Sequence, residues 1–186
     1  MKLLIMGPPG VGKGTQAKQI KSSLDISHIS TGDILRNEIK NNSRVGLSAK
    51  DYINNGKLVP DKILISMIRK RIIKPDCKNG YILDGFPRTL PQANGLNDIL
   101  ADIKKPLDIA ISLYANKDEL INRLVKRGEE SGRSDDKKSV IEERQKVYWN
   151  KTAPLIDFYK DLGLLREIDG LGKIGDVTER ILKAIC

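Results

Sequence analysis

The sequence predicts an α/β fold in which a mainly parallel, five-stranded sheet is flanked by helices. Short apolar runs alternate along the chain with longer segments whose apolar residues recur at helical spacing. A glycine-rich turn connects the first apolar run to the first helical segment, and a later apolar run ends in an acidic residue, Asp84. These features are typical of a domain whose strands all end at one edge of the sheet, where the following loops gather.

Length and composition predict one domain without membrane spans. The 186 residues suffice for a sizeable core, and no apolar run is long enough to cross a bilayer. The first strand begins at the amino terminus, so we expect no signal or transit peptide and a cytoplasmic location. Cys77 and Cys186 are the only cysteines, too few for a disulfide framework or a cysteine zinc site.

A phosphate-binding loop is predicted at residues 7–15, GPPGVGKGT, between the apolar run 3–6 and the helical segment 16–20. Glycines allow successive backbone N–H groups to converge on an anion, and the helix start adds partial positive charge. Lys13 supplies a mobile charge for the outer phosphates. Gly14 takes the place of the hydroxyl residue in the general motif, and Thr15 follows one position later.

The second strand, residues 26–29, leads into a helix at 34–39 through the N-cap types Ser30, Thr31 and Asp33. We expect Arg36, one helical turn on, to face a second ligand. His28 is the only histidine, and we interpret it as a structural residue at the strand end, without a catalytic partner.

A helical excursion of about thirty residues is predicted between this strand and the next, longer than a minimal crossover needs. Asparagines, Gly46, Gly56 and Pro60 divide residues 41–60 into two short helical segments. Another helical run, residues 63–73, ends before Pro75.

The third strand belongs to residues 80–89, GYILDGFPRT. An apolar strand ending in an acid is the Walker B pattern, so Asp84 is predicted to hold water bound to magnesium near the phosphate loop. Arg88, just beyond this edge, can bind a phosphate with two parallel hydrogen bonds. A helix at 90–101 carries Gln92 in its first turn, and a fourth strand is expected at 108–113.

Arginines surround the next loop. A helix at 120–127 places Arg123 and Arg127 one turn apart on one face. We expect a polar loop over residues 128–136, with glycines 128 and 132 as points of flexibility, and then a long helix from about Lys137 that carries Arg144. In a chain with a phosphate loop, this pattern favours function over a merely solvated helix pair.

The last third is expected to complete the core. Tyr148, Trp149 and residues 156–159 are predicted to pack the helical region against the sheet, with Trp149 in the core and Pro154 breaking or kinking the helix. Residues 164–170 form the predicted fifth strand, followed by a turn through Gly172 and a last helix at 174–185.

The net charge of +9 raises the question of nucleic-acid binding. The basic residues are scattered, no recognition motif accompanies them, and aromatic residues at 4% leave few stacking platforms. We therefore expect no nucleic-acid partner, with part of the charge surrounding a nucleotide's phosphates.

Five segments in order resemble the adenylate kinases of the short-lid type, within the nucleoside monophosphate kinase family. They are the phosphate loop at 7–15, STGDILR at 30–36, GKLVPD at 56–61, DGFPRT at 84–89 with Gln92, and SGRSDD at 131–136. The resemblance covers essentially the whole chain. Gly14, which departs from the general motif, is the residue that this family carries.

The resemblance implies reversible transfer of the γ-phosphoryl group of magnesium-ATP to AMP, giving two ADP, in adenine nucleotide homeostasis and AMP salvage. It implies a P-loop NTPase-type three-layer fold with a small helical AMP-binding lobe at 30–59, a short lid at 126–136, and a core of residues 1–29, 60–125 and 137–186. No zinc is expected, because the lid lacks the length and the cysteines of longer-lid relatives. A monomer is the default expectation.

The resemblance also implies site residues, some of which serve more than one role. The expected ATP-binding residues are Gly10, Val11, Gly12, Lys13, Gly14, Thr15, Arg123, Arg127 and Gly172. The expected AMP-binding residues are Thr31, Arg36, Lys57, Leu58, Val59, Gly85, Phe86, Pro87, Arg88, Gln92, Arg133 and Arg144. The expected catalytic residues are Lys13, Arg88, Arg127, Arg133 and Arg144, and Asp84 and Asp33 are expected to hold magnesium through water.

Two other functions stay open at this point. A uridylate-cytidylate kinase would have the same architecture, although Thr31, the pair Arg88-Thr89 and Gln92 favour adenine at the acceptor site. A P-loop switch or nucleic-acid-binding module would use the positive charge, but two phosphate sites and a lid argue against it. The selectivity for the donor base also stays open, because backbone contacts often read that base.

Overall fold

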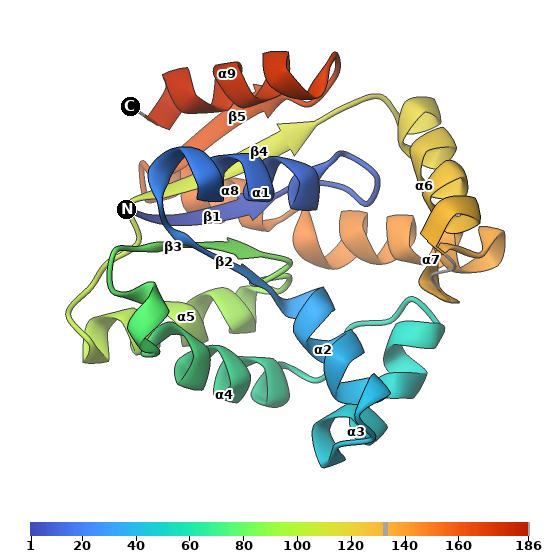
Figure 1. The fold of residues 1–186 in the computed structure, drawn as a ribbon, viewed down its shortest axis with the longest axis horizontal. Coiled ribbons are helices and arrows are strands. Elements are labelled where there is room, and N and C mark those ends of the chain that lie inside the picture. The colour runs from blue at the N-terminus through green and yellow to red at the C-terminus, as the bar shows by residue number, and fades with distance from the viewer. Residues whose placement is uncertain (132–133, 186) are drawn as a thin grey trace.

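A computed structural model describes residues 1–131 and 134–185. Five parallel strands form one sheet in the order β2-β3-β1-β4-β5. Their bounds are β1 Lys2–Met6, β2 Ser27–Ser30, β3 Tyr81–Asp84, β4 Ile109–Tyr114 and β5 Leu165–Asp169. The predicted α/β class and five-stranded parallel sheet are confirmed. The strands point the same way in Figure 1, so their carboxyl ends share one edge.

Helices cover both faces of the sheet. Alternation along β1 sends Leu3 and Ile5 to one side and Leu4 and Met6 to the other. The first side packs against α1 (Lys13–Leu24) and α9 (Ile174–Ile185). The other side packs against α4 (Asp61–Ile72), α5 (Leu90–Asp102) and α8 (Leu155–Asp161). Burial on both faces explains why these strands are continuous apolar runs.

Two groups of helices stand beyond the carboxyl edge of the sheet. Figure 1 shows α2 (Thr31–Lys40) and α3 (Arg44–Asn54) below this edge, and α6 (Lys117–Ser131) beside it. A single 3₁₀ turn, Ser134–Asp136, leads into α7 (Lys138–Val147). Ser30 and Ser43 cap the starts of α2 and α3 by accepting hydrogen bonds from the N–H groups of Asp33 and Gly46. The helix predicted at 34–39 is confirmed as part of α2, but the two short helical segments predicted within residues 41–60 were wrong, because this stretch forms the single helix α3, which continues through Gly46.

The loop expected over residues 128–136 is shorter than predicted. α6 continues through Gly128 to Ser131, so the assignment of a loop at Gly128 was wrong. A Cβ at position 128 would lie 3.0 Å from the carbonyl oxygen of Asp136. The glycine in α6 therefore allows the turn at Asp136 to pack closely against this helix. Gly132, the other glycine expected to be flexible, lies outside the described residues.

The predicted position of Trp149 in the core was also wrong, because its side chain is 56% exposed. A π-helical turn, Tyr148–Thr152, connects α7 to the segment before α8. It turns Tyr148 and Thr152 inward, while the ring of Trp149 stacks edge-on against Tyr148. The break expected at Pro154 is confirmed, because α8 begins at the next residue.

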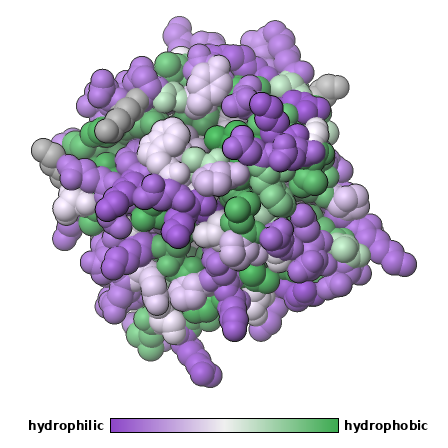
Figure 2. Space-filling view, turned by 180° about the vertical axis from the view of Figure 1, so that it is seen from behind, coloured by the Kyte–Doolittle hydropathy of each residue, from purple (hydrophilic) through white to green (hydrophobic). Residues whose placement is uncertain are grey.

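The surface is mixed in character. On the face in Figure 2, hydrophilic and hydrophobic residues are interspersed rather than divided into two regions. No helix in the described part of the chain is long and apolar enough to cross a membrane.

A 3₁₀ turn, Pro75–Cys77, connects α4 to β3 and buries the Cys77 thiol.

Candidate active site

A cleft of about 630 Å³ opens at the carboxyl edge of the sheet, between the phosphate loop, α2, α6 and α7. It brings together residues that are far apart in the sequence. Most of the site residues predicted from the sequence line it: Gly10, Val11, Gly12, Lys13, Gly14, Thr15, Thr31, Asp33, Arg36, Lys57, Leu58, Val59, Asp84, Gly85, Pro87, Arg88, Arg123, Arg127, Arg144 and Gly172.

The phosphate loop presents a helix start without a side-chain cap. α1 follows Gly12, whose φ of 98° lies in the left-handed region, and no side chain of the described residues caps this end. The N–H groups of the first turn are therefore available to an anion. A Cβ on Gly10 would lie 2.5 Å from the carbonyl oxygen of Leu120, so only glycine fits where the loop crosses the start of α6.

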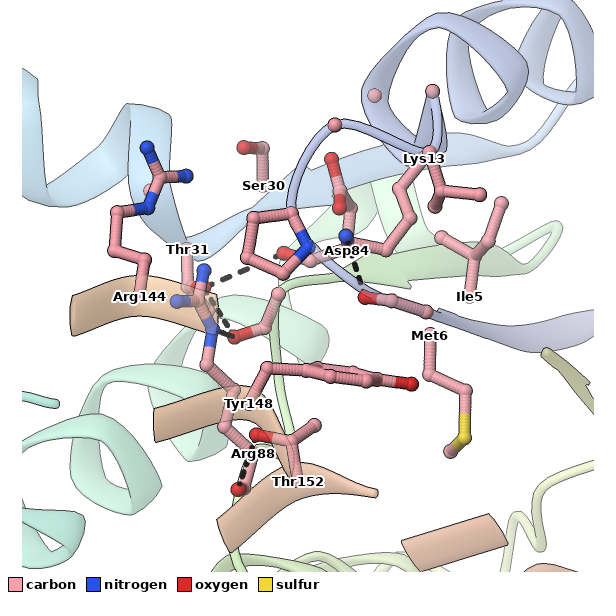
Figure 3. Close-up of a pocket in the computed structure, with 18 of the residues that line it drawn as sticks. Ile5, Met6, Lys13, Ser30, Thr31, Asp84, Arg88, Arg144, Tyr148 and Thr152 are labelled. Atoms are coloured by element: carbon pink, nitrogen blue, oxygen red, sulfur yellow. Dashed lines mark hydrogen bonds between the residues drawn. The ribbon is translucent and has the colours of Figure 1, made fainter. Parts of the chain in front are cut away.

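Lys13 is held inside this loop. Its Nζ donates a hydrogen bond to the carbonyl oxygen of Gly7 at 2.7 Å (Figure 3) and another to that of Pro8 at 3.0 Å. Burial lowers the pKa of Lys13 from 10.5 to about 7, with nearby arginines adding to the effect and Asp84 opposing it. Without a bound anion, the lysine is close to half charged at neutral pH.

This lowered pKa predicts proton uptake if the phosphates of ATP bind beside Lys13, as the sequence predicts. Phosphates beside Nζ favour the charged amine, which at pH 8 is only about 10% populated when the pKa is about 7. Binding at pH 8 is therefore expected to take up about 0.9 proton, and about 0.1 at pH 6. Calorimetric titrations of magnesium-ATP in two buffers of different ionisation enthalpy measure this number. Equal uptake at both pH values would contradict the prediction.

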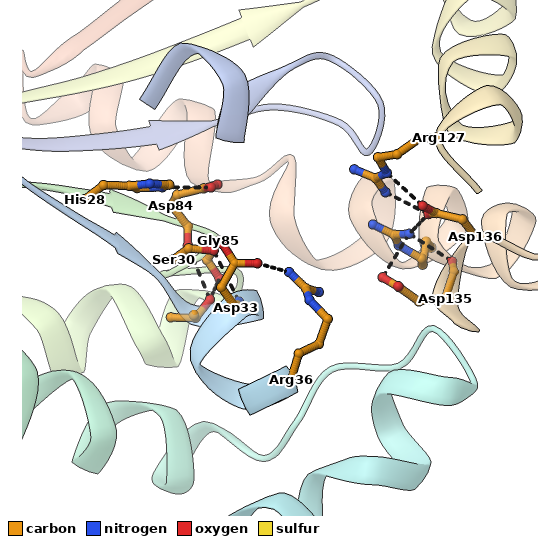
Figure 4. A network of polar contacts seen from close by, with 11 residues as sticks. His28, Ser30, Asp33, Arg36, Asp84, Gly85, Arg127, Asp135 and Asp136 are labelled. Atoms are coloured by element: carbon orange, nitrogen blue, oxygen red, sulfur yellow. Dashed lines mark hydrogen bonds and ion pairs between the residues drawn. The ribbon is translucent and has the colours of Figure 1, made fainter. Parts of the chain in front are cut away.

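Asp84 lies at the end of β3, next to the phosphate loop. Its Oδ2 is 3.2 Å from Nε2 of His28, and a Cβ on Gly14 would lie 3.3 Å from the same oxygen (Figure 4). His28 was predicted to have no catalytic partner beside it; the structure pairs it with Asp84, because β2 and β3 are neighbours and residues 30 and 84 share register. The glycine at position 14 leaves room for this carboxylate.

Arg88 is held at both ends: the loop after β3 binds its side chain, and Thr152 binds its backbone carbonyl. Its Nε donates to the carbonyl oxygen of Gly85 at 2.8 Å, and its carbonyl oxygen accepts from Thr152 Oγ1 at 2.9 Å (Figure 3). Burial lowers the pKa of Arg88, and the neighbouring Arg144 lowers it further. The guanidinium is therefore a poorly solvated cation that faces the cleft beside other cations, a setting that favours an incoming anion.

Thr31 and Arg36 bring α2 to the cleft. Thr31 Oγ1 donates to the carbonyl oxygen of Gly85 at 2.9 Å, which ties the start of α2 to the loop after β3. Arg36 pairs with Asp33 one turn earlier, on the cleft side of the helix (Figure 4). Asp33, one of the two predicted magnesium residues, thus has a cationic partner in this structure.

Phe86 and Gln92 do not line the cleft, although both were predicted as site residues. Both are fully buried. Gln92 Oε1 accepts the N–H of Arg88 at 2.7 Å, and its Nε2 donates to Asp61 Oδ1 at 2.7 Å. The predicted contact of Gln92 with a base stays a prediction; in this structure its amide supports the backbone of Arg88.

Two arginines share one buried carboxylate on the opposite side of the cleft. Arg127 donates two hydrogen bonds of 2.7 Å to Asp136, and Arg144 donates a third of 2.6 Å (Figure 4). Arg144 also lies 3.1 Å from a carboxylate oxygen of Asp135. Burial alone would raise the pKa of Asp136, but the two arginines hold it below its ordinary value. Arg133, the third predicted lid arginine, lies outside the described residues.

Sequence reasoning assigned no role to Asp135 and Asp136. They stand in the segment that carried the resemblance, yet their neighbours in sequence are polar and charged, so a buried carboxylate was not distinguishable there. No helical spacing indicates it, because Asp136 ends a 3₁₀ turn and Arg144 lies on the following helix α7. Burial of the Asp136 side chain, with 0% exposed, is a tertiary result.

Comparisons with known proteins show which family the sequence matches. A family model described as adenylate kinase matches residues 5–164. An adenylate kinase of Leptospira biflexa is 50% identical over 184 residues, which cover 99% of each chain. An adenylate kinase of Bifidobacterium longum is 47% identical over 98% of each chain. An adenylate kinase of Stenotrophomonas maltophilia is 44% identical over 100% of this chain and 99% of the relative.

Proposed function

The chain belongs to the adenylate kinase family and is a phosphotransferase between ATP and AMP, and we propose that the cleft described above binds both nucleotides and transfers the γ-phosphoryl group between them. One observation carries the assignment of the site. An uncapped helix start with Lys13 faces, across one cleft, a set of arginines that includes Arg36, Arg88 and Arg144. Two anionic ligands can therefore meet end to end.

In this proposal the donor lies on the phosphate loop. The N–H groups at the start of α1 and the Lys13 ammonium receive the β- and γ-phosphates, as expected for residues 10–15. Arg123 and the turn at Gly172 line the same part of the cleft and are assigned to the donor base and ribose side. Arg127, one turn after Arg123 on α6, is assigned to the transferring phosphoryl group.

The acceptor AMP is assigned to the side of the cleft formed by α2 and the loop after β3. Arg36 and Arg88 are proposed to bind its phosphate, because both guanidinium groups line the cleft there. Thr31, residues 57–59 and 85–87, and Gln92 are proposed to surround its base and ribose. We further propose residues 30–59 as the AMP-binding lobe, 126–136 as the lid, and the remaining chain as the core.

The chemistry requires alignment and charge neutralisation rather than a base. The attacking group is already an anionic phosphate oxygen, so no proton has to be removed. Lys13, Arg88, Arg127 and Arg144 offset the charge that spreads over the transferring phosphoryl group. Arg133 keeps its assignment here from the family resemblance alone.

The cleft also suits a magnesium ion bound with the donor. Magnesium retains several waters and takes one or two carboxylates together with substrate phosphates. Asp84 provides such a carboxylate beside the phosphate loop, whereas Asp33 is engaged with Arg36. Among the described residues, no three His, Cys, Asp or Glu side chains cluster as a metal site. When bound, the ion neutralises donor phosphate charge.

Water exclusion explains why the site is divided among separate helices. Water could attack ATP in a site that forms without AMP, so arginines that reach their final positions only on closure protect the donor. The absence of zinc, the monomeric state and the cytoplasmic location stay predictions.

An acceptor comparison tests the proposed function. In a coupled assay of ADP formation from magnesium-ATP, strong stimulation by AMP, and little by CMP or UMP, is expected. Stimulation by CMP or UMP would retain the mechanism but overturn the assignment of the acceptor base to Thr31 and Gln92. ATP hydrolysis indifferent to all three acceptors would overturn the second nucleotide site.

A further inference from the structure

The turn between β5 and α9, residues 169–173, lines the cleft through Gly170 and Gly172. Glycine has no side chain beyond a hydrogen atom, so a ligand in this part of the cleft contacts the backbone of the turn. Gly172 has a φ of 110°, in the left-handed region that favours glycine. The position of this backbone therefore decides how the turn can bind a nucleotide base.

Three successive carbonyl groups in this turn are each bound by a guanidinium. Arg180, on α9, donates from Nη1 to the carbonyl oxygen of Asp169 and from Nη2 to that of Leu171 at 2.6 Å. Arg123, on α6, donates to the intervening carbonyl oxygen of Gly170 at 3.2 Å. The fork of Arg180 thus spans the turn, as the planar guanidinium allows and a lysine ammonium does not.

Other contacts restrain the same turn from both ends. Gly170 donates its N–H to the carbonyl oxygen of Tyr114 at 2.8 Å, and Asp169 Oδ1 accepts the N–H of Leu171 at 2.9 Å. Beyond the turn, the carbonyl of Lys173 accepts the N–H of Val177 at 3.2 Å. Within the described structure, the Gly172 carbonyl is the one in residues 169–173 for which no hydrogen-bond partner is found.

Arg180 also lies against Gly172 itself. A Cβ at position 172 would lie 3.0 Å from Arg180 Nη2, so the guanidinium packs against the α-carbon of Gly172. We propose that Arg180 is a positioning residue for recognition of the donor base: by binding the carbonyl groups of Asp169 and Leu171, it holds the Gly172 carbonyl toward the cleft, where it can accept a hydrogen bond from an exocyclic amine. This inference rests on the proposed placement of ATP.

The proposal predicts an effect confined to the donor. Without Arg180, the turn samples more conformations, and apparent affinity falls by the fraction of molecules in which the turn is correctly placed. A carbonyl acceptor favours adenine, which carries a 6-amino donor, over hypoxanthine, which carries a carbonyl there. A mobile turn should therefore weaken ATP binding and reduce the preference for ATP over inosine triphosphate.

Arg180→Met tests this with two comparison variants. Arg180→Lys retains the charge but cannot span two carbonyl groups. Lys183→Met removes a nearby cation on α9 whose side chain is 75% exposed and pairs only with Glu179 among its described contacts. The KM for ATP is expected to rise about tenfold in Arg180→Met and less in Arg180→Lys, while the KM for AMP stays within about twofold. Lys183→Met should match the wild type.

The two substrates distinguish positioning from a loss of folded protein. Loss of folded enzyme lowers kcat for every substrate and leaves the ratio of the two KM values unchanged. Unchanged KM for ATP, equal rises for ATP and AMP, or an unchanged preference over inosine triphosphate would each overturn the proposal. Calorimetric titration with ATP alone measures the same loss of affinity without turnover. A wild type that binds ATP but does not phosphorylate AMP would overturn the proposed function, and the effect of Arg180→Met on ATP affinity would still decide this inference.

Discussion

Replacement of Arg144 by methionine is expected to lower kcat by about 10² to 10³, because it removes a cation that we propose faces the transferring phosphoryl group. The fold should largely tolerate the change. Asp136, which Arg144 contacts at 2.6 Å, keeps both of its 2.7 Å hydrogen bonds to Arg127, so the buried carboxylate is not left without a counter-ion. The expected result is a large loss of rate with a loss of only a few degrees in Tm.

Steady-state kinetics and thermal unfolding of the same preparations measure both quantities. Arg69→Met is the matched control, since it removes an arginine that forms a 2.6 Å ion pair with Asp102 on the surface, with its side chain 50% exposed. Such pairs contribute about 0 to 1 kcal/mol, so both rate and Tm should stay near the wild type. If Arg144→Met unfolds at a much lower temperature and the folded fraction retains full kcat, Arg144 is structural instead.

Replacement of Lys13 by methionine is expected to reduce the rate by about 10³ and to raise thermal stability at low pH. The loss of rate follows from the removal of the charge that we propose lies beside the donor phosphates. The gain in stability follows from burial, which lowers the pKa of Lys13 to about 7 in the folded protein from 10.5 in the unfolded chain. A buried cation destabilises the folded state, and methionine fills similar space without a charge.

The sign of the pH dependence follows from proton binding. Between about pH 7 and 10.5, the unfolded chain binds a proton at Lys13 that the folded protein does not, so the stability of the wild type rises with pH across this window. The destabilising effect is complete below the folded pKa. The advantage of Lys13→Met should therefore be greatest near pH 6 and shrink toward pH 10.

Differential scanning fluorimetry at pH 6 and pH 9.5 tests this dependence. Methionine also loses the hydrogen bonds to the carbonyl groups of Gly7 and Pro8, each contributing about 1 kcal/mol. We expect a net rise in Tm of about 5 °C at pH 6. Lys21→Met, an exposed lysine on the same helix, should change neither Tm nor rate. A lower Tm for Lys13→Met at pH 6 together with a loss of rate below tenfold would contradict both expectations.

Local patterns in the sequence predicted most of the scaffold. Each strand is an apolar run bounded by turn residues, and burial on both faces makes such runs easy to recognise. The phosphate loop was predictable because glycines, a lysine and a helix start must be consecutive in the chain to surround a phosphate. The family resemblance, confirmed by the comparisons, supplied the expected roles of distant arginines.

Long-range pairing was not predictable in the same way. Nothing adjacent to His28 in the sequence indicates Asp84, because the contact depends on the order and register of β2 and β3. Trp149 was misplaced because its residue type favoured the core, whereas the π-helical turn buries Tyr148 and Thr152 and leaves Trp149 56% exposed. The end of α6 was misplaced because Gly128 suggested a loop, whereas the approach of Asp136 explains this glycine.

The sequence by itself determined the α/β class and the phosphate loop. These properties are encoded in residues that are adjacent or that recur at a fixed period, so they are independent of how distant segments meet. Only the tertiary structure decided that Asp136 is buried between Arg127 and Arg144, and that Arg180 and Arg123 bind three carbonyl groups of one turn. These charged groups lie on different elements, so they acquire partners, and lose their water, only when the sheet and its helices bring those elements together.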